Sequence, residues 1–208
     1  MRDAMLGRGI PAVSCDLLPS RSARGEHLQC DLLDALASRK WRGLIAFPDC
    51  TYLTCSAEWA YQDGPYHQKV KPETLVGKAR RAARVEAVQF FLKLWNCGLE
   101  RVVLENPVGV IADRTGIRPS QTIQPYEFGD DASKRTCLWI RGLPLLETTA
   151  YVAPRLVNGM PRWANQTDSG QNKLSPGINR ARDRSKTFPG IAEPWLGNLG
   201  STRTFLRR

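Results

Sequence analysis

Short apolar runs recur along the chain, and most of them end at a proline or a polar residue. Five of these runs have strand character, namely residues 10–15, 27–31, 43–47, 101–104 and 136–140. Short apolar runs bounded by turn-forming residues are typical of β-strands. The run 43–47 is continuously apolar and stops at Pro48, which is the pattern of a parallel strand buried on both faces.

Two further segments have helical character. In residues 78–96, apolar side chains recur at helical spacing and basic side chains occupy other positions. The apolar set is Ala79, Ala82, Val85, Val88, Phe91, Leu92 and Trp95, and the basic set is Arg80, Arg81, Arg84 and Lys93. Gly98 follows as the expected C-cap, and residues 32–38 predict a shorter helix.

The alternation of strands with helices predicts an α/β fold with a mostly parallel sheet and crossover helices. In such sheets ligands bind beyond the carboxyl ends of the strands, where Asp16, Asp31 and residues 48–50 and 105–107 are expected to lie. A chain of 208 residues buries roughly 70% of its unfolded surface, so we expect residues 1–208 to form one domain. That domain includes an irregular basic segment at about 145–187 and a tail at about 194–208.

The basic residues are concentrated in the last third of the chain. The formal net charge is +10, and from Ala132 onward thirteen Lys and Arg stand against four Asp and Glu. This bias favours a polyanionic partner, although a solvated basic face is an equal alternative. The candidate phosphate contacts are Lys134, Arg135, Arg141, Arg180, Arg182, Arg184 and Lys186, and Trp163 and Phe188 lie among them as either base-stacking or core residues.

The six cysteines are spread through apolar runs, which favours reduced thiols over disulfides. There is no Cys-x-x-Cys pair and there are only two histidines, so the sequence predicts no metal site. No apolar run approaches eighteen residues and the N-terminus lacks an apolar signal core, so we expect a cytoplasmic protein without a membrane contact. The oligomeric state leaves no sign in the sequence.

Two chemically useful residues follow predicted strands. Cys50 lies in the segment Pro48-Asp49-Cys50 after one strand, and Glu105 begins Glu105-Asn106-Pro107 after another. A thiol and a carboxyl group brought together at strand ends suit nucleophilic attack on an electron-poor ring with assistance from a proton donor. The alternative for Cys50 alone is a buried small apolar residue.

Taken in order, the motifs resemble those of the cytosine-5 DNA methyltransferases, and most closely the compact relatives in phage and prophage genomes. In that family a Pro-Pro-Cys turn carries the nucleophile and a Glu-Asn-Val or Glu-Asn-Pro turn carries the glutamate. The compact relatives also contain four segments that stand here at residues 16–19, 50–54, 106–109 and 184–192. The likeness covers roughly residues 9–192, and its strength lies in the order of the motifs.

The resemblance implies a Rossmann-like fold of the S-adenosylmethionine-dependent methyltransferase type, and it implies a mechanism. Cys50 would attack carbon 6 of cytosine while Glu105 contacts the ring nitrogen. Asn106 and Pro107 would hold the glutamate turn against the substrate, which is cytosine in DNA or a cytosine nucleotide. The cofactor S-adenosylmethionine would contact Asp16 through its ribose, Asp31 near its adenine, and Pro48. Without the family, an N-cap or a turn is the favoured reading of either aspartate.

The chain departs from the family pattern in three places. Family members open with a strand and a glycine loop, whereas residues 1–6 look like the helix after that loop, so we expect the first strand to be lacking. Asp49 replaces the middle proline of the nucleophile turn, and residues 194–200 break the expected helix. These departures keep two alternatives open: a catalytically impaired nucleic-acid-binding relative, and a Rossmann-like enzyme of another class that uses Cys50.

Overall fold

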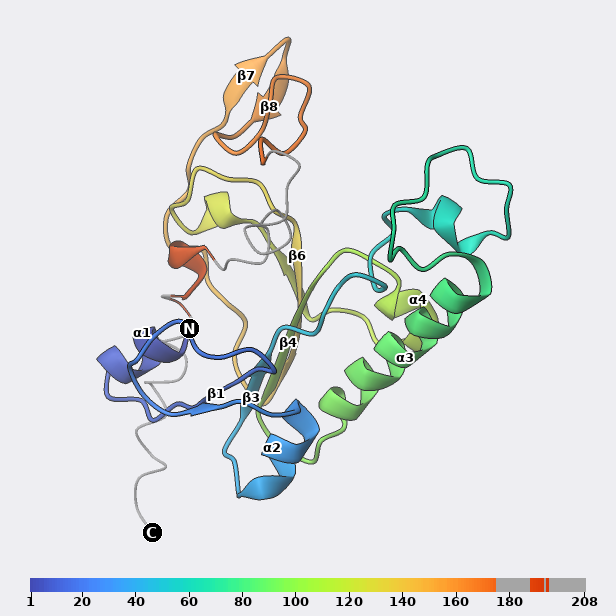
Figure 1. Cartoon of the computed structure of the whole chain (residues 1–208). Coiled ribbons are helices and arrows are strands. Elements are labelled where there is room, and N and C mark those ends of the chain that lie inside the picture. The colour runs from blue at the N-terminus through green and yellow to red at the C-terminus, as the bar shows by residue number, and fades with distance from the viewer. Residues whose placement is uncertain (175–187, 193, 195–208) are drawn as a thin grey trace. The chain divides into compact units, whose positions relative to one another are not determined.

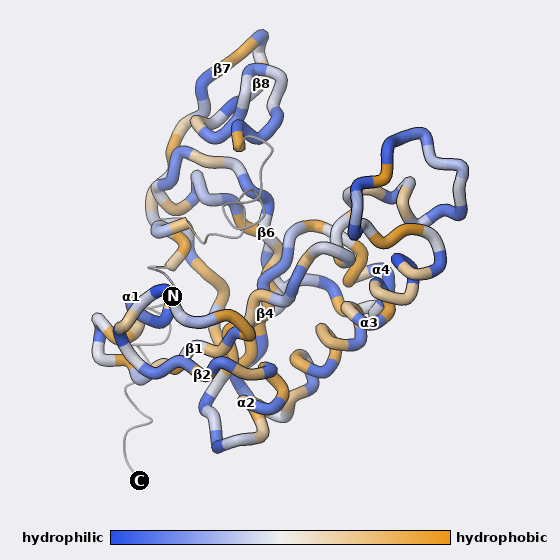
Figure 2. The backbone as a smooth tube through the Cα atoms, viewed as in Figure 1, coloured by the Kyte–Doolittle hydropathy of each residue, from blue (hydrophilic) through white to orange (hydrophobic). Residues whose placement is uncertain are grey.

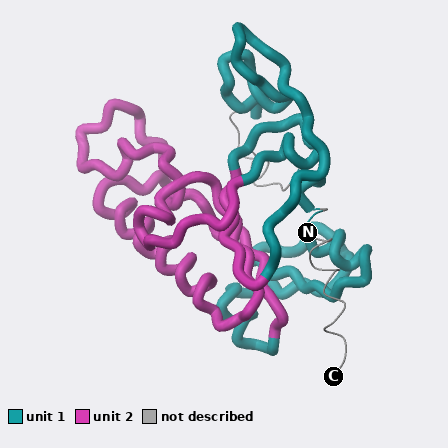
Figure 3. Tube along the Cα trace, turned by 180° about the vertical axis from the view of Figure 1, so that it is seen from behind, with its two compact units in different colours: residues 1–40, 123–135, 143–208 teal, residues 41–122, 136–142 magenta. Residues whose placement is uncertain are grey.

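The computed structural model describes residues 1–174, 188–192 and 194 of the chain (Figure 1). The chain divides into two compact units, which Figure 3 distinguishes by colour. The sheet unit comprises Trp41–Thr122 and Thr136–Gly142, and the terminal unit comprises Met1–Lys40, Ile123–Arg135 and Leu143–Arg208. The units are interleaved in sequence, because the chain leaves each one and re-enters it.

A four-stranded sheet forms the centre of the sheet unit, in the order β3-β4-β6-β5. Its strands are β3 (Leu44–Ala46), β4 (Val102–Pro107), β5 (Gln121–Ile123) and β6 (Thr136–Arg141). β3 and β4 are parallel, whereas β4 and β6 are antiparallel. The α/β class is confirmed, but the expectation of a mostly parallel sheet is wrong for this sheet, which is mixed.

The connections between strands explain the mixed sheet. A parallel neighbour requires a crossover of a dozen or more residues, usually a helix, that carries the chain back along the sheet. The helix α3 (Gly77–Trp95) supplies that crossover between β3 and β4. Between β4 and β6 the chain forms the five-residue α4 (Ile111–Thr115), the strand β5 and the short 3-10 helix η2 (Pro125–Glu127), so no long crossover helix intervenes and β6 runs in the opposite direction.

The core of the sheet unit lies between α3 and the sheet. Phe91 of α3 is fully buried, and its ring meets the ring of Trp139 in β6 edge to face at 5.0 Å. The first three residues of β4 are buried as well, and Figure 2 shows the hydrophobic stretch that they form. The burial of consecutive residues shows that both faces of the first half of β4 are covered.

The buried stripe of α3 differs from the predicted one in its first half. Arg80 and Arg84 are buried there together with Val88 and Phe91, whereas Val85 is 60% exposed. The 3-10 helix η1 (Glu58–Tyr61) packs on this part of α3 and offers a carboxylate and an aromatic ring, and Tyr52 and Thr54 before it offer backbone carbonyls. Arginine can satisfy all three, so it takes the place of an apolar side chain.

The terminal unit is built from short elements. They are α1 (Arg2–Gly7), β1 (Ser14–Cys15), β2 (His27–Leu28), α2 (Leu32–Ser38), η2, β7 (Arg155–Val157) and β8 (Met160–Arg162). The predicted helices at both the start of the chain and residues 32–38 are confirmed. β1 and β2 form a parallel pair of only two residues each, so both strands are shorter than predicted.

The segment predicted as irregular contains the hairpin β7–β8. Its turn is Asn158-Gly159, with φ of 50° and 76°. Two successive residues of positive φ are the signature of a tight hairpin turn, and Asn-Gly is the strongest short sequence signal for it. The sequence therefore contained the signal for this hairpin.

Among the described residues, no helix combines the length and apolar character needed to cross a membrane.

Candidate functional site

Cys50 lies in a turn that directly follows β3. Its carbonyl oxygen accepts hydrogen bonds from the backbone N–H groups of Leu53 and Thr54, at 3.0 and 3.2 Å. The Asp49 carboxylate accepts from both the backbone N–H and the hydroxyl of Thr51, at 2.9 and 2.7 Å. Asp49 thus caps the turn. The Cys50 side chain is half-buried in this turn.

A buried hydrogen bond ties this turn to the end of β4. Nδ2 of Asn106 donates to the carbonyl oxygen of Pro48 at 2.8 Å, and Asn106 is 1% exposed. Pro48 precedes Cys50 by two residues and Asn106 follows Glu105 directly, so the bond joins the two segments that carry the thiol and the carboxyl group. The other side-chain atom of Asn106, Oδ1, is buried and accepts no hydrogen bond from the described residues.

The far end of the turn is attached to the chain after β4. The backbone N–H of Val110 donates to the carbonyl oxygen of Leu53 at 2.8 Å, and Thr54 forms a bridge to Gly109. A Cβ on Gly109 would lie 1.9 Å from that same Leu53 oxygen, so no other residue fits without a backbone shift. Residues 48–54 are therefore held against residues 106–110 at both ends.

The strand register corrects the prediction that residues 105–107 follow a strand, because β4 continues to Pro107 and Glu105 lies within it. Ala46, the last residue of β3, pairs with Leu104, and Glu105 follows Leu104. The carboxyl ends of parallel neighbours meet at the same edge. Glu105 is half-buried there and pairs through its Cα with Leu138 of β6.

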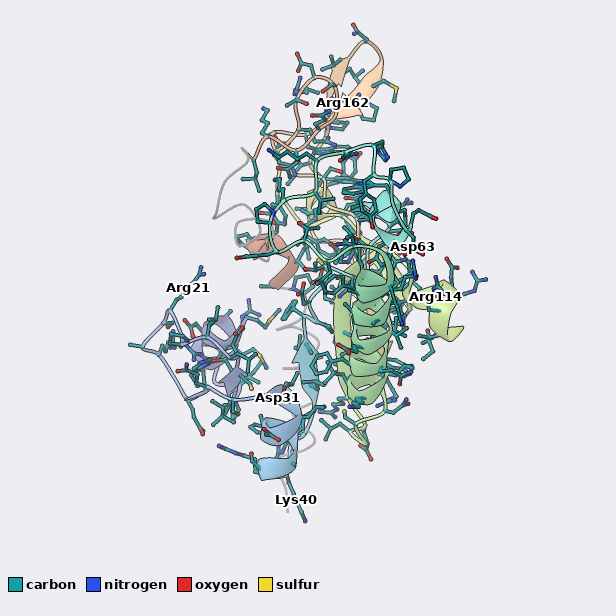
Figure 4. All side chains as sticks on the ribbon, turned by 45° about the vertical axis from the view of Figure 1, so that its right-hand side comes forward. Arg21, Asp31, Lys40, Asp63, Arg114 and Arg162 are labelled. Atoms are coloured by element: carbon teal, nitrogen blue, oxygen red, sulfur yellow. The ribbon has the colours of Figure 1, made fainter. Side chains whose placement is uncertain are left out.

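The two predicted cofactor aspartates lie in the terminal unit and have local structural roles. Asp16 follows β1, and its Oδ1 accepts from the backbone N–H of Leu18 at 2.9 Å. Asp31 follows β2 and caps α2 by accepting from the N–H of Leu33 at 2.7 Å, as its place at the start of that helix in Figure 4 illustrates. Both side chains are exposed, and each engages one carboxylate oxygen in this way.

Two thiols are neighbours beside these aspartates. Sγ of Cys15 donates to the carbonyl oxygen of Cys30 at 3.3 Å. Burial and the adjacent Cys30 thiol together raise the pKa of the Cys15 thiol to about 11. Cys15 is therefore almost entirely protonated at neutral pH.

The predicted phosphate contacts fall into three groups. Lys134 is half-buried and Arg135 is exposed. Arg141 bonds the carbonyl oxygen of Leu99 at 2.9 Å and stacks on Trp95, so it holds the sheet unit together. Arg180, Arg182, Arg184 and Lys186 lie outside the described residues.

Of the two aromatic candidates, Trp163 is a core residue. It is 8% exposed and stacks on Tyr126 with ring centroids 4.1 Å apart. Phe188 is half-buried.

The described residues contain no group of three or more His, Cys, Asp or Glu side chains that could hold a metal ion.

Sequence reasoning missed the arginines that contact the segment after Cys50. Arg84 reaches the carbonyl oxygens of both Tyr52 and Thr54 from α3. A signal for it exists in the sequence, since Arg80 and Arg84 continue the stripe of Val88 and Phe91 at spacings of four, four and three residues.

Comparison with protein-family models gives no match for this chain, and comparisons with curated proteins and with solved structures give no significant match either.

Proposed function

We propose that this protein transfers a methyl group from S-adenosylmethionine to carbon 5 of cytosine in DNA, with Cys50 as the nucleophile and Glu105 as the assisting acid. The observation that carries the proposal is the buried hydrogen bond from Asn106 to Pro48, at 2.8 Å. It fastens the cysteine turn, which follows β3, to the strand β4, in which Glu105 lies next to Asn106. This is the arrangement that the resemblance to Rossmann-like cytosine-5 methyltransferases leads us to expect.

The residues of the sheet unit suit each step of the reaction. The Cys50 thiolate would form a bond to carbon 6, and the ring electrons would move toward the nitrogen that Glu105 protonates. Carbon 5 then becomes nucleophilic and takes up the methyl group. Water takes the proton from carbon 5, the electrons of that C–H bond restore the ring double bond and expel the thiolate, and the ring nitrogen returns its proton to Glu105. Both Cys50 and Glu105 thus return to their starting states.

S-adenosylmethionine, when bound, would supply an electrophilic methyl group. Asp16 and Asp31 fit the expected contacts because they are exposed carboxylates after adjacent parallel strands. Among the described residues, hydrogen bonds engage Oδ1 of each aspartate, which leaves Oδ2 to accept from a hydroxyl or an amino group. The third expected contact, Pro48, is buried, and its carbonyl oxygen is already engaged by Asn106.

The direct test is transfer of a labelled methyl group by the full chain to duplex DNA and, separately, to deoxycytidine monophosphate. Wild-type protein should label one of the two substrates. Cys50→Ser and Glu105→Gln should each reduce labelling by on the order of a hundredfold or more. Cys97→Ser, a matched change outside the site, should retain it. The proposal is wrong if the wild-type chain labels neither substrate although calorimetry shows that it binds S-adenosylmethionine.

The charge distribution supports a second candidate function, in which the chain binds nucleic acid without catalysis. From Ala132 onward the chain carries thirteen basic residues against four acidic ones, and Arg135 is exposed. Phosphate contacts release counterions, so affinity for duplex DNA should fall as salt rises. Binding that weakens steeply with salt but is accompanied by no methyl transfer favours this candidate. Affinity that is independent of salt contradicts it.

A further inference from the structure

Two arginines of α3 are almost completely buried. Arg80 is 7% exposed and Arg84 is 6% exposed. Long basic side chains are almost never buried to this degree unless they are paired. Neither residue belongs to the motifs that suggested methyl transfer, so their burial requires an explanation of its own.

Within the described part of the chain, the hydrogen bonds of Arg84 reach one stretch, and that stretch continues from Cys50. Its Nε donates to the carbonyl oxygen of Tyr52 at 3.0 Å, and its Nη2 donates to that of Thr54 at 3.1 Å. Its fork also binds both carboxylate oxygens of Glu58, at 2.6 and 3.3 Å. The Tyr61 ring lies against the guanidinium, with its centroid 3.4 Å from Cζ. Arg84 thus fixes the backbone two and four residues after the nucleophile.

The electrostatics of this contact are favourable. Burial would lower the pKa of Arg84, but the hydrogen bonds to Glu58 and the neighbouring Tyr61 outweigh burial and raise it. In return, the hydrogen bonds from Arg84 hold the pKa of Glu58 below its usual value, although partial burial opposes this shift. The pair is therefore charged on both sides throughout the neutral range, and its geometry persists there.

Arg80 supports the same segment less completely. Its guanidinium lies 4.7 Å from the ring centroid of Tyr61 and 5.3 Å from that of Tyr52. Its Nη1 donates to the carbonyl oxygen of Leu75 at 3.3 Å, but its buried Nε meets no acceptor among the described residues. A buried cation compensated mainly by aromatic rings contributes less to stability than a well-packed apolar residue of similar volume. Stability alone therefore does not account for this pair of arginines.

The contacts of Arg84 complete the support of the cysteine turn. Asn106 holds the turn at Pro48, and Gly109 with Val110 holds it at Leu53 and Thr54. Without Arg84, the carbonyl group of Thr54 would lose its side-chain donor, and that of Tyr52 would keep only the longer hydrogen bond from the Tyr61 hydroxyl, at 3.3 Å, so the turn would be held mainly from the β4 side. A thiol whose backbone can rotate loses the orientation that attack on a ring requires.

We propose that Arg84 is a positioning residue for the Cys50 nucleophile, with Glu58 and Tyr61 holding the Arg84 guanidinium in place and Arg80 lying over the Tyr61 ring. Its effect on turnover rests on the proposed function, whereas its effect on the Cys50 thiol does not. Both consequences are measurable in the full-length protein.

The experiment compares Arg84→Gln and Arg84→Lys with the control Arg81→Gln. Arg81 also lies on α3 and also binds this segment, but it reaches the carbonyl oxygen of Tyr61 and the exposed Asp63, which Figure 4 labels. The first readout is the rate at which iodoacetamide alkylates Cys50, measured by peptide mass spectrometry relative to Cys97 in the same molecule. The second readout is the kcat of methyl transfer, with the KM for S-adenosylmethionine.

In Arg84→Gln, we expect alkylation of the half-buried Cys50 to rise by about threefold or more relative to Cys97, because the turn opens locally. We expect kcat to fall by about tenfold or more with KM unchanged, because the thiol is misplaced. Arg84→Lys, which keeps the charge but lacks the fork, should lie between Arg84→Gln and wild type, and Arg81→Gln should match wild type.

The proposal is overturned if Arg84→Gln leaves the ratio of Cys50 to Cys97 alkylation unchanged, or if Cys97 becomes reactive in parallel, which indicates global destabilisation. Should Arg84→Gln fail to fold, the same ratio in Arg84→Lys decides. If wild-type protein transfers no methyl group, the proposed function fails, while the alkylation ratio still tests the positioning role.

Discussion

The sharpest prediction concerns Asn106, whose amide joins the two halves of the candidate site. Replacing it with alanine removes the donor to the buried Pro48 carbonyl group, which costs roughly 1–3 kcal/mol. The same change removes the buried Oδ1, which has no hydrogen-bond donor among the described residues. Removing this unsatisfied acceptor stabilises the folded state by a similar free energy. The small cavity adds about 1 kcal/mol, so we expect Asn106→Ala to be destabilised by only about 1 kcal/mol while turnover is largely lost.

Replacing the same residue with aspartate has a larger effect that depends on pH. The Asn106 donor now lies 2.8 Å from the Pro48 carbonyl oxygen, at a position that is 1% exposed. An ionised carboxylate there would place a second acceptor against that oxygen. We expect a cost of about 3–5 kcal/mol at neutral pH. Protonation restores a donor, so the folded protein raises the pKa of the new carboxyl group. At about 1.4 kcal/mol per pKa unit, this cost corresponds to a rise of about two to four units from the ordinary value near 4.

The sign of the pH dependence follows from that shift. A group with a raised folded pKa contributes stability below its unfolded pKa, and this stability is lost as the pH rises through the folded pKa. Asn106→Asp should therefore approach wild-type stability near pH 4 and lose about 3–5 kcal/mol by pH 8.

Urea unfolding at pH 4.5, 6 and 7.5 measures the difference in unfolding free energy between variant and wild type. Asn172→Asp is the matched control, because Asn172 is exposed and its Oδ1 accepts a backbone hydrogen bond that aspartate can also accept. If Asn106→Asp follows wild type at all three pH values, the buried hydrogen bond does not join the two turns in solution.

The remaining predictions concern other parts of the described chain. Gly109→Ala should destabilise the protein by about 3 kcal/mol or more, because a Cβ there meets a carbonyl oxygen at 1.9 Å. Gly116→Ala has open space around it and should cost only about 1 kcal/mol for its positive φ. Thermal unfolding of the two variants measures the difference. At pH 8, Cys15 should be alkylated roughly tenfold more slowly in the native protein than in denaturant, because its pKa is raised. The difference in rate should vanish above pH 11. Equal rates at pH 8 contradict the raised pKa. Arg84 lowers the pKa of Glu58, so the difference in unfolding free energy between wild type and Glu58→Gln should be present above about pH 5. This difference should be lost as the pH falls through the folded pKa of Glu58. A difference that is constant from pH 7 to pH 3 argues against the pair.

The elements that position the candidate site were predictable because their patterns are local. The continuous apolar run of β3, the periodicity of α3 and the boundaries of α2 all follow from residue order alone. The direction of β6 was not predictable in this way, because it depends on the connection between strands and not on the composition of either strand.

Sequence motifs suggested the residues of the candidate site but not the side chains that support them. Cys50 stands out because it follows a strand within a recognisable motif, whereas Glu105 lies inside β4 and not after it, as the motif had suggested. The burial of Arg84 could not be read from polarity, since it depends on a carboxylate and carbonyl groups that are 26 to 32 residues away in sequence. The capping role of Asp31 was foreseen as an alternative, because short polar residues before a helix commonly serve it.

The most direct test of the central claim is the intact mass of the protein after incubation with S-adenosylmethionine and duplex DNA that contains 5-fluorocytosine. Fluorine at carbon 5 cannot leave as a proton does, so the bond between the Cys50 sulfur and carbon 6 should persist. The account predicts a covalent protein–DNA adduct that maps to Cys50 and is absent in Cys50→Ser. An adduct at another cysteine, or methyl transfer to ordinary cytosine that survives in Cys50→Ser, would contradict it.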